Sequence, residues 1–373
     1  MTTLWYLPEH PTVKNPYGQL LIRSLEARGI RVVRLLYAHL FVRQALSERP
    51  DVVHFQFVQP YILPAENERS WWRAIVKGLL FLLQVFLLRV AGARIVWTVH
   101  DLADHEQRLV RLEWFFTLLF TRVAHRIVVH GDVARAAVVD RYHLQRHARK
   151  LAVIFHPNYI GAYPDTLTRA QAREQLGIRP EAVVLLSVGQ IRPYKGLMAL
   201  VQAFRALRTH VTRELWIAGE PVDASLTADL AREADADPSI RIRAAFQSPE
   251  EIERLLKACD VVVLPYRAIL TSGAALLAMS FGRPCIAPRL GCLVEALDTN
   301  GAFLYDSSAP DGLRHALENA LASVSQLPAM GAHNFERASA WSWSRAAELL
   351  DDVYHGGGRG SGDGKRDAVV ASG

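Results

Sequence analysis

The stretch GQIRPYKG, Gly189–Gly196, constrains this chain most, because it joins an apolar strand-like run to an amphipathic run through a turn with two cations. The run VVLLSV before it predicts a buried strand, and LMALVQAFRAL after it predicts a helix. A helix N-terminus presents unpaired N–H groups and a partial positive charge, which favour an anion. Arg192 can bind two phosphate oxygens and Lys195 adds a point charge. We therefore predict a diphosphate site with Gly189, Arg192 and Lys195, the alternative being two solvated loop cations.

Strand-like and helix-like patterns alternate along the rest of the chain. Short apolar runs such as RVVRLLY, DVVHFQF, RIVWTV, ELWIAG and DVVVLPY are separated by helical patterns in both halves. This alternation predicts βαβ units with parallel sheets. The 373 residues suit two domains of ordinary size or one large α/β domain. The sequence therefore predicts an α/β fold with two Rossmann-like domains that face a cleft.

The segment Trp71–Arg94 is the most apolar part of the chain, and three interpretations of it remain open. It is a helix buried against the sheet, an interfacial helix with tryptophans at the lipid headgroups, or a transmembrane span. Its length is borderline for a span, and polar residues interrupt it. These residues are Arg73, Lys77, Gln84 and Arg89.

A net charge of +6 and a pI of about 9.3 suit anionic partners such as nucleotides or phospholipid headgroups. The basic residues are scattered without an RNA- or DNA-binding signature, so nucleic acid is disfavoured. The three cysteines show no metal-ligand spacing and fit a reducing cytosol, and MTTLWYLPEH lacks a signal-peptide pattern. We interpret Asp235 and Asp237 as a solvated helix end and expect no metal site.

Five motifs carry a resemblance to a known family. They are NPYGQLL, TVHDLADHE, HPNYIGAYP, GQIRPYKG and LPYRAILTSGAALLAMSFGRP. The last two, about 70 residues apart, together resemble the donor half of GT-B glycosyltransferases. All five resemble bacterial exopolysaccharide enzymes of the xanthan type, the GDP-mannose:glycolipid β-1,4-mannosyltransferases.

The resemblance implies an acceptor-binding N-terminal domain (1–165), a nucleotide-sugar-binding domain (166–338) and a last helix (339–356) that crosses back to the first domain. The remainder, 357–373, lacks apolar periodicity and is expected to be disordered. The implied reaction is hexosyl transfer (EC 2.4.1-type), with mannose favoured, from a GDP- or UDP-linked donor to a polyprenyl-diphosphate-linked glycan. Its implied place is the inner face of the cytoplasmic membrane, where the chain would be a peripheral protein.

One departure from the family pattern concerns two glutamates that retaining GT-B enzymes carry eight residues apart. Alignment on AMSFGRP places Ile269 and Leu277 at these positions, and neither side chain is a carboxylate. The resemblance without the pair favours an inverting transferase. The turn Thr271, Ser272 and Gly273 still offers hydroxyl and N–H donors for the diphosphate. The alternative for this turn is a helix cap without a ligand.

Glycosyl transfer releases a nucleoside diphosphate, so fixed cations and N–H donors must meet the growing negative charge. Arg192, Lys195 and the TSG turn fill that role, and neither a divalent metal nor another cofactor is expected. An inverting enzyme also needs a base for the acceptor hydroxyl proton. HDLADHE, at the carboxyl end of a strand, offers carboxylates there. The comparable mannosyltransferases have Asn at Asp101 and Pro at Asp104, which favours Glu106 over Asp101.

The remaining site predictions are contacts around the two substrates. His100 is expected to bind a sugar, a structural role being the alternative, and His105 to lie on the acceptor side. Acceptor contacts are also predicted at the first βα loop, with an ordinary helix entry as the alternative. Donor contacts are predicted after two later strands, with a core position as the alternative for Tyr266. These residues are Asn15, Tyr17 and Gly18 for the acceptor, and Phe246, Gln247 and Tyr266 for the donor.

The sequence also leaves other functions open besides glycosyl transfer. An epimerase or phosphorylase would share the fold; an epimerase would need extra acid–base pairs near the sugar, and a phosphorylase would need a cofactor lysine, which is not identified. A catalytically inactive chain that binds nucleotide or scaffolds polysaccharide assembly is the main alternative, because Ile269 and Leu277 replace the glutamates. The sequence leaves open GDP or UDP, the acceptor sugar, the linkage, the anomeric outcome and the oligomeric state.

Overall fold

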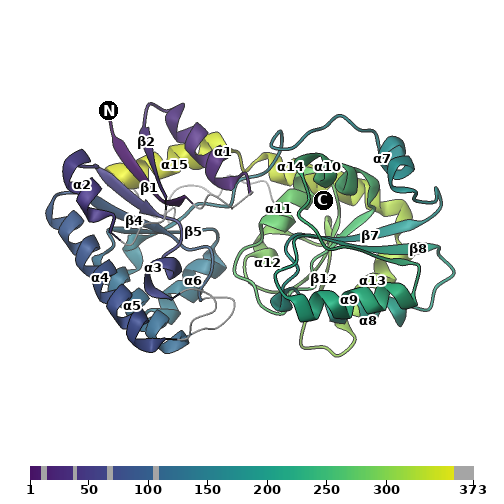
Figure 1. The fold of residues 1–373 in the computed structure, drawn as a ribbon. Helices are drawn as coiled ribbons and strands as arrows, with labels where there is room; N and C mark the ends of the chain where they lie inside the picture. The colour runs from purple at the N-terminus through teal and green to yellow at the C-terminus, as the bar shows by residue number, and fades with distance from the viewer. Residues whose placement is uncertain (10–14, 37–39, 65–69, 104–108, 357–373) are drawn as a thin grey trace. The chain divides into compact units, whose positions relative to one another are not determined.

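The computed structural model describes residues 1–9, 15–36, 40–64, 70–103 and 109–356. The chain divides into two compact units. Unit 1 contains Met1–Phe155 and Trp343–Gly373, and unit 2 contains His156–Ser342. The chain thus leaves unit 1 once and returns to it for its last helix (Figure 1).

Unit 1 is built on a parallel sheet with the strand order β2-β1-β3-β4-β5-β6. Its order reverses at β1, so the loops after β1 and β3 diverge at the carboxyl edge, where open α/β sheets bind ligands. The strands are β1 (Thr3–Glu9), β2 (Arg31–Leu36), β3 (Val52–Phe55), β4 (Arg94–Thr98), β5 (Arg126–Val129) and β6 (Leu151–Val153).

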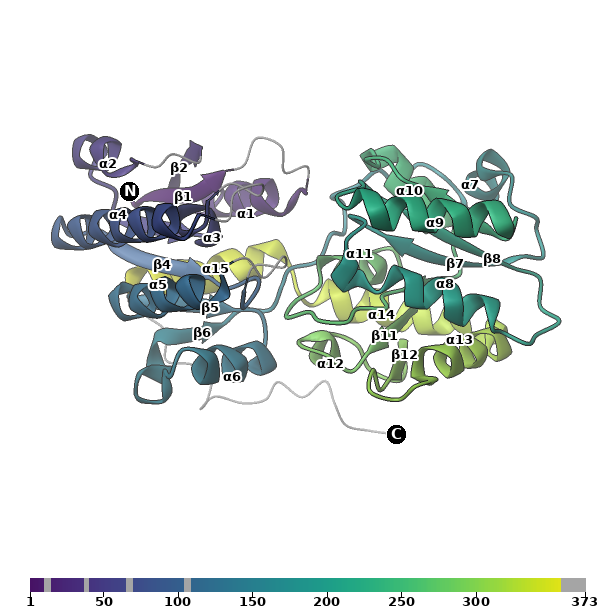
Figure 2. The same ribbon diagram turned by 60° about the horizontal axis from the view of Figure 1, so that its bottom comes forward.

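Helices cover both faces of this sheet (Figures 1 and 2). One face carries α4 and α5, which pack through a cluster of aromatic rings from Phe55, Phe81, Trp97 and Phe120. The helices are α1 (Tyr17–Glu26), α2 (Val42–Glu48), α3 (Gln59–Ile62), α4 (Trp71–Val90), α5 (Val110–Val123), α6 (Asp132–Arg141), the 3-10 turn η1 (Gln145–Lys150) and α15 (Trp343–His355).

The last helix, α15, belongs to the core of unit 1. Its buried residues Ala347, Leu350 and Val353 pack with α1 and with alternate side chains of β1, such as Leu4. An ion pair between Arg28, two residues after the end of α1, and Asp351 on α15, 3.3 Å long, adds a contact at the surface. The residues WSRAAELLDDVYH therefore form a helix with one apolar face.

Unit 2 is built on a second parallel sheet, with the strand order β12-β11-β10-β7-β8-β9. This is the doubly wound order of Rossmann folds, and its direction reverses between β7 and β10. The strands are β7 (Val183–Val188), β8 (Arg213–Ala218), β9 (Ile240–Arg243), β10 (Val261–Val263), β11 (Cys285–Pro288) and β12 (Ala302–Tyr305). The predicted α/β fold with two Rossmann-like domains is confirmed.

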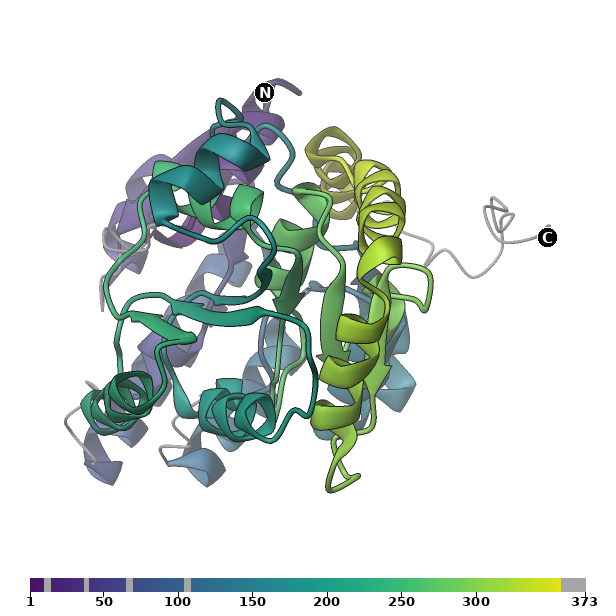
Figure 3. The same ribbon diagram turned by 90° about the vertical axis from the view of Figure 1, so that its right-hand side faces the viewer.

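The sheet of unit 2 lies between two helix layers (Figures 1 and 3), with α8, α9 and α13 on one face and α10 and α11 on the other. Ser248 and Glu251 form a capping box at the start of α10. The helices are α7 (Arg169–Leu176), η2 (Pro193–Lys195), α8 (Leu197–Arg205), α9 (Ala224–Ala236), α10 (Pro249–Ala258), α11 (Gly273–Ser280), α12 (Leu293–Ala296), α13 (Gly312–Ala322), η3 (Val324–Gln326) and α14 (Leu327–Ser339).

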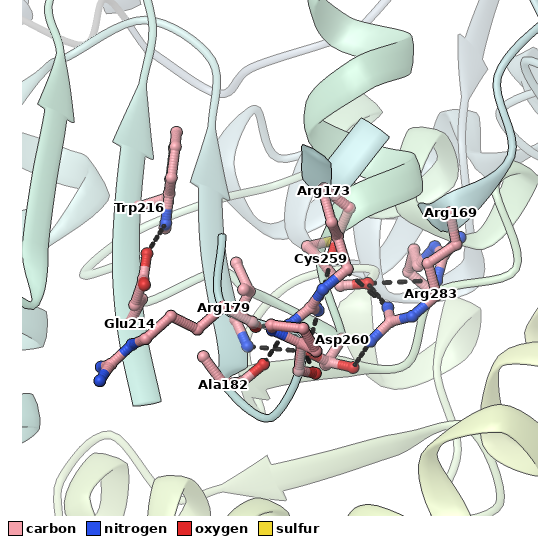
Figure 4. A network of polar contacts seen from close by, with 12 residues as sticks. Arg169, Arg173, Arg179, Ala182, Glu214, Trp216, Cys259, Asp260 and Arg283 are labelled. Carbon is pink, nitrogen blue, oxygen red and sulfur yellow. Dashed lines mark hydrogen bonds and ion pairs between the residues drawn. The ribbon is translucent and has the colours of Figure 1, made fainter. Parts of the chain in front are cut away.

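A polar network anchors α7 at the amino end of β7 and β10 (Figure 4). The Asp260 carboxylate accepts from the guanidinium groups of Arg169 (2.6 Å) and Arg173 (3.3 Å). It also accepts from the backbone N–H of Val184 at 2.7 Å. Arg173 is buried and donates further to the carbonyls of Arg179 and Ala182. This network lies at the strand ends opposite the predicted ligand loops, so its role is structural.

The structure also bears on the predictions about the apolar segment, the cysteines and Asp237. The segment predicted from Trp71 forms α4, with one side buried and the other exposed. Among the described residues, no helix combines the length and apolar character that crossing a bilayer requires. The three cysteines are free and buried. Asp237 caps its own turn by accepting from the N–H and hydroxyl of Ser239. The predicted disordered tail lies outside the described residues.

Candidate functional site

The predicted diphosphate loop follows β7, at the edge where the strand order of unit 2 reverses. The loop after β10 lies against it, because the N–H of Arg267 donates to the carbonyl of Tyr194 at 2.8 Å. Gly196 permits this approach: it has a φ of 69°, and a Cβ there would lie 2.1 Å from the Pro265 carbonyl oxygen. The two loops that flank the switch point are therefore held together.

Gly189 makes room for the side chain of Lys195. Its φ is 112°, a conformation that favours glycine, and a Cβ there would lie 2.6 Å from Nζ of Lys195. The Lys195 ammonium lies 3.4 Å from the Val188 carbonyl oxygen and 5.7 Å from the centre of the Tyr266 ring. The short turn η2 thus folds the lysine back under Gly189, the glycine that follows β7.

Lys195 is a buried cation, with 8% of the residue exposed. Burial, and then the charge of Arg192, lower its pKa to about 8. Within the described ranges, no carboxylate forms an ion pair with Lys195. A buried ammonium without a counter-charge is costly, and an anion next to it would offset that cost. The Lys195 ammonium therefore provides a positive charge with which a phosphate oxygen can form an ion pair.

Arg192 lies on the same loop, three residues before Lys195, and is half-buried. Its Nε donates to Oε1 of Gln190 at 3.1 Å. The electrostatic effect of Arg192 on Lys195 shows that the two cations share one region. The structure thus brings together Gly189, Arg192 and Lys195, while their contact with a diphosphate stays a prediction.

The second predicted donor turn begins α11. The hydroxyl of Ser272 accepts from the N–H of Ala275, which makes Ser272 the N-cap residue. The Tyr266 hydroxyl lies 2.9 Å from the Ser272 hydroxyl, and the Tyr266 ring stacks with Tyr194 at 6.2 Å. Tyr266 thus connects the N-terminus of α11 with the loop of Lys195. Thr271 is half-buried beside this cap.

His156 and Tyr159, which lie beside the start of α11, were not among the predicted site residues. A Cβ on Gly273 would lie 3.2 Å from the Tyr159 hydroxyl and 3.8 Å from Nε2 of His156. Nδ1–H of His156 donates to the Pro157 carbonyl, so Nε2 is the acceptor in the neutral ring. The motif HPNY was noted only for its resemblance, although its His and Tyr are side chains that commonly contact ligands.

The two candidates after β9 differ in burial. Gln247 is buried, and its Nε2 donates to the Ala245 carbonyl at 2.8 Å. Its Oε1 is buried and lacks a hydrogen-bond partner among the described residues. Phe246 beside it is exposed. A nucleobase could donate to the unsatisfied buried acceptor and stack on the exposed ring. The contact of Phe246 and Gln247 with the donor stays a prediction.

Ile269 and Leu277 lie where the family pattern has glutamates. Leu277 is buried within α11, and Ile269 is half-buried in the loop before it. A Cβ on Gly291 would lie 2.4 Å from the Ile269 carbonyl oxygen, so the loop is tightly packed. Neither position therefore supplies a carboxylate to the site.

Unit 1 gathers aromatic and imidazole rings at the carboxyl ends of neighbouring strands. His100 follows β4 and stacks on Phe57, which follows β3, at 4.9 Å between ring centres. Its ring also lies 5.2 Å from Tyr17, at the start of α1, and 5.1 Å from His130, which follows β5. The structure thus brings the predicted residues His100 and Tyr17 together and adds His130 and Phe57.

A hydrogen-bond relay fixes the proton positions on two histidines. Oε1 of Gln56 only accepts, so Nε2–H of His100 must donate to it, at 3.0 Å. The Gln56 amide nitrogen donates to Nε2 of His54 at 3.2 Å, and the Thr98 hydroxyl does so at 2.7 Å. Nδ1–H of His54 therefore donates to the Tyr354 hydroxyl, at 2.7 Å. The relay connects α15 with the strand-end residue His100.

The buried members of this cluster are neutral imidazoles. Burial, and then the proximity of His130, lower the pKa of His54 to about 3. Burial lowers the pKa of His130 to about 4, partly opposed by its hydrogen bond to the Ile154 carbonyl. Neutral rings with fixed tautomers can orient a sugar hydroxyl or keep His100 oriented. Sequence analysis missed His54 and Gln56, although their alternation in DVVHFQF places both on one strand face.

The other predicted residues of unit 1 are placed as follows. Oδ1 of Asn15 accepts from the N–H of Tyr17 at 3.0 Å, which supports the entry to α1. A Cβ on Gly18 would lie 3.0 Å from the Tyr6 hydroxyl. Asp101 is half-buried directly after His100. The candidates Asp104, His105 and Glu106 lie outside the described residues. In the described ranges, no group of three His, Cys, Asp or Glu is placed to hold a metal ion.

Comparisons with known proteins agree with this arrangement. Residues 182–323 match the family model described as "Glycosyl transferases group 1". The chain is 28% identical over 320 residues to a GDP-mannose:glycolipid 4-beta-D-mannosyltransferase of Xanthomonas campestris pv. campestris, covering 84% of this chain and 82% of that protein. It is 28% identical over 243 residues to a D-inositol 3-phosphate glycosyltransferase of Corynebacterium kroppenstedtii, covering 62% of this chain and 53% of that protein.

Solved structures give the same fold. Anabaena HepE in complex with UDP and glucose superposes with a TM-score of 0.72 at 15% identity, covering 95% of this chain and 99% of that chain. Sucrose-phosphate synthase from Thermosynechococcus elongatus superposes with a TM-score of 0.73 at 16% identity and the same coverage. Both match across the two units, and at these identities they establish the architecture. The predicted resemblance to GT-B glycosyltransferases is confirmed.

Proposed function

We propose that this chain, which has the GT-B fold and carries a group 1 glycosyl transferase domain over residues 182–323, moves a hexose from a nucleoside diphosphate sugar to a lipid-linked oligosaccharide. Mannose is the favoured sugar, since the Xanthomonas relative is a mannosyltransferase that uses GDP-mannose and a glycolipid. The proposal includes an inverting reaction without a metal ion, in exopolysaccharide synthesis at the inner face of the cytoplasmic membrane.

The observation that supports this proposal most is the environment of Lys195. It is a buried ammonium at the switch point of a Rossmann sheet, beside Arg192 and without a carboxylate partner in the described ranges. Such a site favours a ligand with two or more negative charges, as a nucleoside diphosphate has. The N-terminus of α11, capped by Ser272, adds N–H donors on the next loop.

The chemistry follows from where charge develops. The bond between the anomeric carbon and the diphosphate oxygen breaks, and that oxygen takes the electron pair, while the acceptor hydroxyl oxygen forms the new bond to the anomeric carbon. Arg192, Lys195 and the N–H groups of the TSG turn would stabilise this charge more in the transition state than before it. In the inverting form of the proposal, a base on unit 1 takes the proton of the acceptor hydroxyl. Glu106 and Asp101 remain its candidates, and the fixed ring of His100 would orient a hydroxyl.

The first experiment is a calorimetric titration of the purified chain with GDP, UDP and their mannose, glucose and glucuronate conjugates, with and without a chelator. We expect binding of one nucleotide in the micromolar range that survives the chelator and is lost in Arg192→Ala. Gln202→Ala, on the exposed side of α8, is the matched control and should bind as the native chain does. Failure of all these ligands to bind would argue against the proposal.

A second experiment separates the two carboxylate candidates. Glu106→Gln should abolish transfer to a lipid-linked acceptor and leave nucleotide binding unchanged, whereas Asp101→Asn should retain transfer. The change removes the proton acceptor and keeps the size of the side chain. If Glu106→Gln transfers the sugar as well as the native chain does, Glu106 is not the catalytic base. If only Asp101→Asn loses glycosyl transfer, Asp101 is the base.

A catalytically inactive nucleotide-binding chain is the second candidate. Ile269 and Leu277 favour it, because apolar side chains stand where two carboxylates are expected in retaining relatives. The two candidates differ in one measurement. The inactive chain would bind a nucleotide sugar with micromolar affinity. It would neither transfer nor hydrolyse the sugar with any lipid-linked acceptor, and this result would support a scaffolding role.

A further inference from the structure

Unit 1 exposes a continuous apolar stripe on the side of α4 that faces away from the sheet. Its large side chains recur at intervals of four, three, four, three and four residues, which places them on one helix face. They are Trp72, Val76, Leu79, Leu83, Phe86 and Val90, each exposed by 54% or more. With 20 residues, α4 extends this stripe over about 30 Å.

The neighbouring helix α5 widens the exposed surface. Phe115 and Leu119, four residues apart, are 46% and 36% exposed. The two helices approach closely, because a Cβ on Gly78 would lie only 2.6 Å from ring atoms of Phe116. Figures 1 and 2 both show α4 and α5 side by side on the outside of unit 1. We call the stripe of α4 together with Phe115 and Leu119 the α4–α5 face.

The exposed charges of these two helices have one sign. Their sequences contain a single carboxylate, Glu113, which is buried. Trp72 lies near one end of the face, with the guanidinium of Arg73 5.3 Å from its ring centre. The cations are Arg73 and Lys77 in the first two turns of α4, Arg89 in its last turn, and Arg111 and Arg122 at the two ends of α5. An apolar face with cations at both ends complements an anionic lipid surface.

We propose that the α4–α5 face docks unit 1 on the surface of a bilayer that contains anionic phospholipids. This proposal rests on the proposed function, because a lipid-linked acceptor holds its reacting sugar near such a surface. The apolar side chains enter the boundary between headgroups and acyl chains. Trp71 and Trp72 lie at headgroup level, and the cations meet lipid phosphates.

A second copy of the chain is a poorer occupant of the same face. A two-fold symmetric interface places the same patch on both partners, so the five cations would oppose five cations. Like charges across an interface are unfavourable, and Glu113 is buried and unavailable to pair with them. Anionic headgroups supply the opposite charge instead. Contiguous exposed apolar side chains of this extent are uncommon on monomeric proteins without a binding role.

The test uses the full chain and sedimentation with vesicles. Vesicles of phosphatidylethanolamine and phosphatidylglycerol are compared with vesicles of phosphatidylcholine alone. We expect binding to the anionic vesicles that weakens at least tenfold as salt rises from about 50 to about 500 mM, since salt screens the electrostatic part. We expect little binding to phosphatidylcholine.

Variants then locate the contact. Leu79→Asp with Phe86→Asp, both at exposed positions, should reduce partitioning to anionic vesicles at least tenfold while keeping the thermal midpoint of the native chain. Phe335→Asp is the matched control, since Phe335 is 43% exposed on unit 2. It should bind vesicles normally. Arg73→Gln with Arg111→Gln should weaken binding severalfold and flatten its salt dependence.

Three results would overturn the proposal. The native chain could stay in the supernatant with both vesicle types, or the aspartate variant could bind as well as Phe335→Asp. A concentration-dependent dimer that the aspartate variant abolishes would identify a second copy as the occupant. Nucleotide calorimetry on the same variants keeps the two proposals apart, because the donor site lies in unit 2. A variant that loses vesicle binding but keeps the native nucleotide affinity therefore reports on docking and not on the proposed function.

Discussion

The ammonium nitrogen of Lys195 lies 2.6 Å from the position that a Cβ atom on Gly189 would occupy. The glycine at the end of β7 is therefore a spatial requirement of the buried lysine. Gly189 also has a φ of 112°, so two separate effects of a side chain must be distinguished. One is backbone strain, and the other is displacement of the cation.

Gly189→Ala should weaken nucleotide binding at least tenfold, because the methyl group pushes the Lys195 ammonium away from its place. Gly177→Ala is the matched control: Gly177 has a φ of 63°, and a Cβ there meets nothing within 4 Å. Both changes should cost about 1–2 kcal/mol of unfolding free energy through strain. Calorimetry and urea unfolding measure the two effects, and equal affinities in both variants would contradict the spatial argument.

Nucleotide affinity should fall as pH rises through about 8. Burial and Arg192 lower the pKa of Lys195 to about 8, and an anion binds the protonated form. The phosphates are already fully ionised there, so affinity should decline about tenfold per pH unit well above this pKa. Burial raises the pKa of the neighbouring Tyr266, which stays neutral. Lys195→Met should bind weakly and without this dependence between pH 7 and 9.5. A native profile that is flat over this range would contradict the role of Lys195.

The lowered pKa of Lys195 also makes the stability of the fold depend on pH. The folded pKa of Lys195 lies below its usual value of 10.5, so the unfolded chain binds more protons between pH 8 and 10.5. The contribution of Lys195 to the free energy of unfolding therefore rises with pH across this window. Comparison of the native chain with Lys195→Met by urea unfolding isolates that contribution.

The sequence predicted the parts of the site that depend on local patterns. The strand, turn and helix around Arg192, the cap at Ser272 and the capping box of Ser248 are all readable within about ten residues. The relay of His54 could not be predicted in this way, because its hydrogen-bond partner Tyr354 is 300 residues away. The approach of Tyr159 to Gly273 depends likewise on tertiary packing.

Tyr354→Phe should destabilise unit 1 by about 1–3 kcal/mol. The change removes the acceptor for Nδ1–H of His54, and a buried donor without a partner loses the hydration that it had when unfolded. Tyr305→Phe is the control, since the described residues give its hydroxyl no hydrogen bond. Urea unfolding measures both variants. A loss of equal size in both would mean that packing, rather than the relay, explains the effect.

Asp260→Asn should destabilise unit 2 by about 3 kcal/mol, because Asp260 is the counter-charge of the buried Arg173 (Figure 4). The amide keeps the size of the side chain but removes the negative charge that also pairs with Arg169. Glu348→Gln is the matched control: it makes the same chemical change in an exposed pair with Arg345 and should leave stability unchanged. The network lies at the amino ends of β7 and β10, so nucleotide affinity below the unfolding transition should stay native. Lower affinity in a fully folded Asp260→Asn variant would mean that α7 also positions the loops at the opposite strand ends.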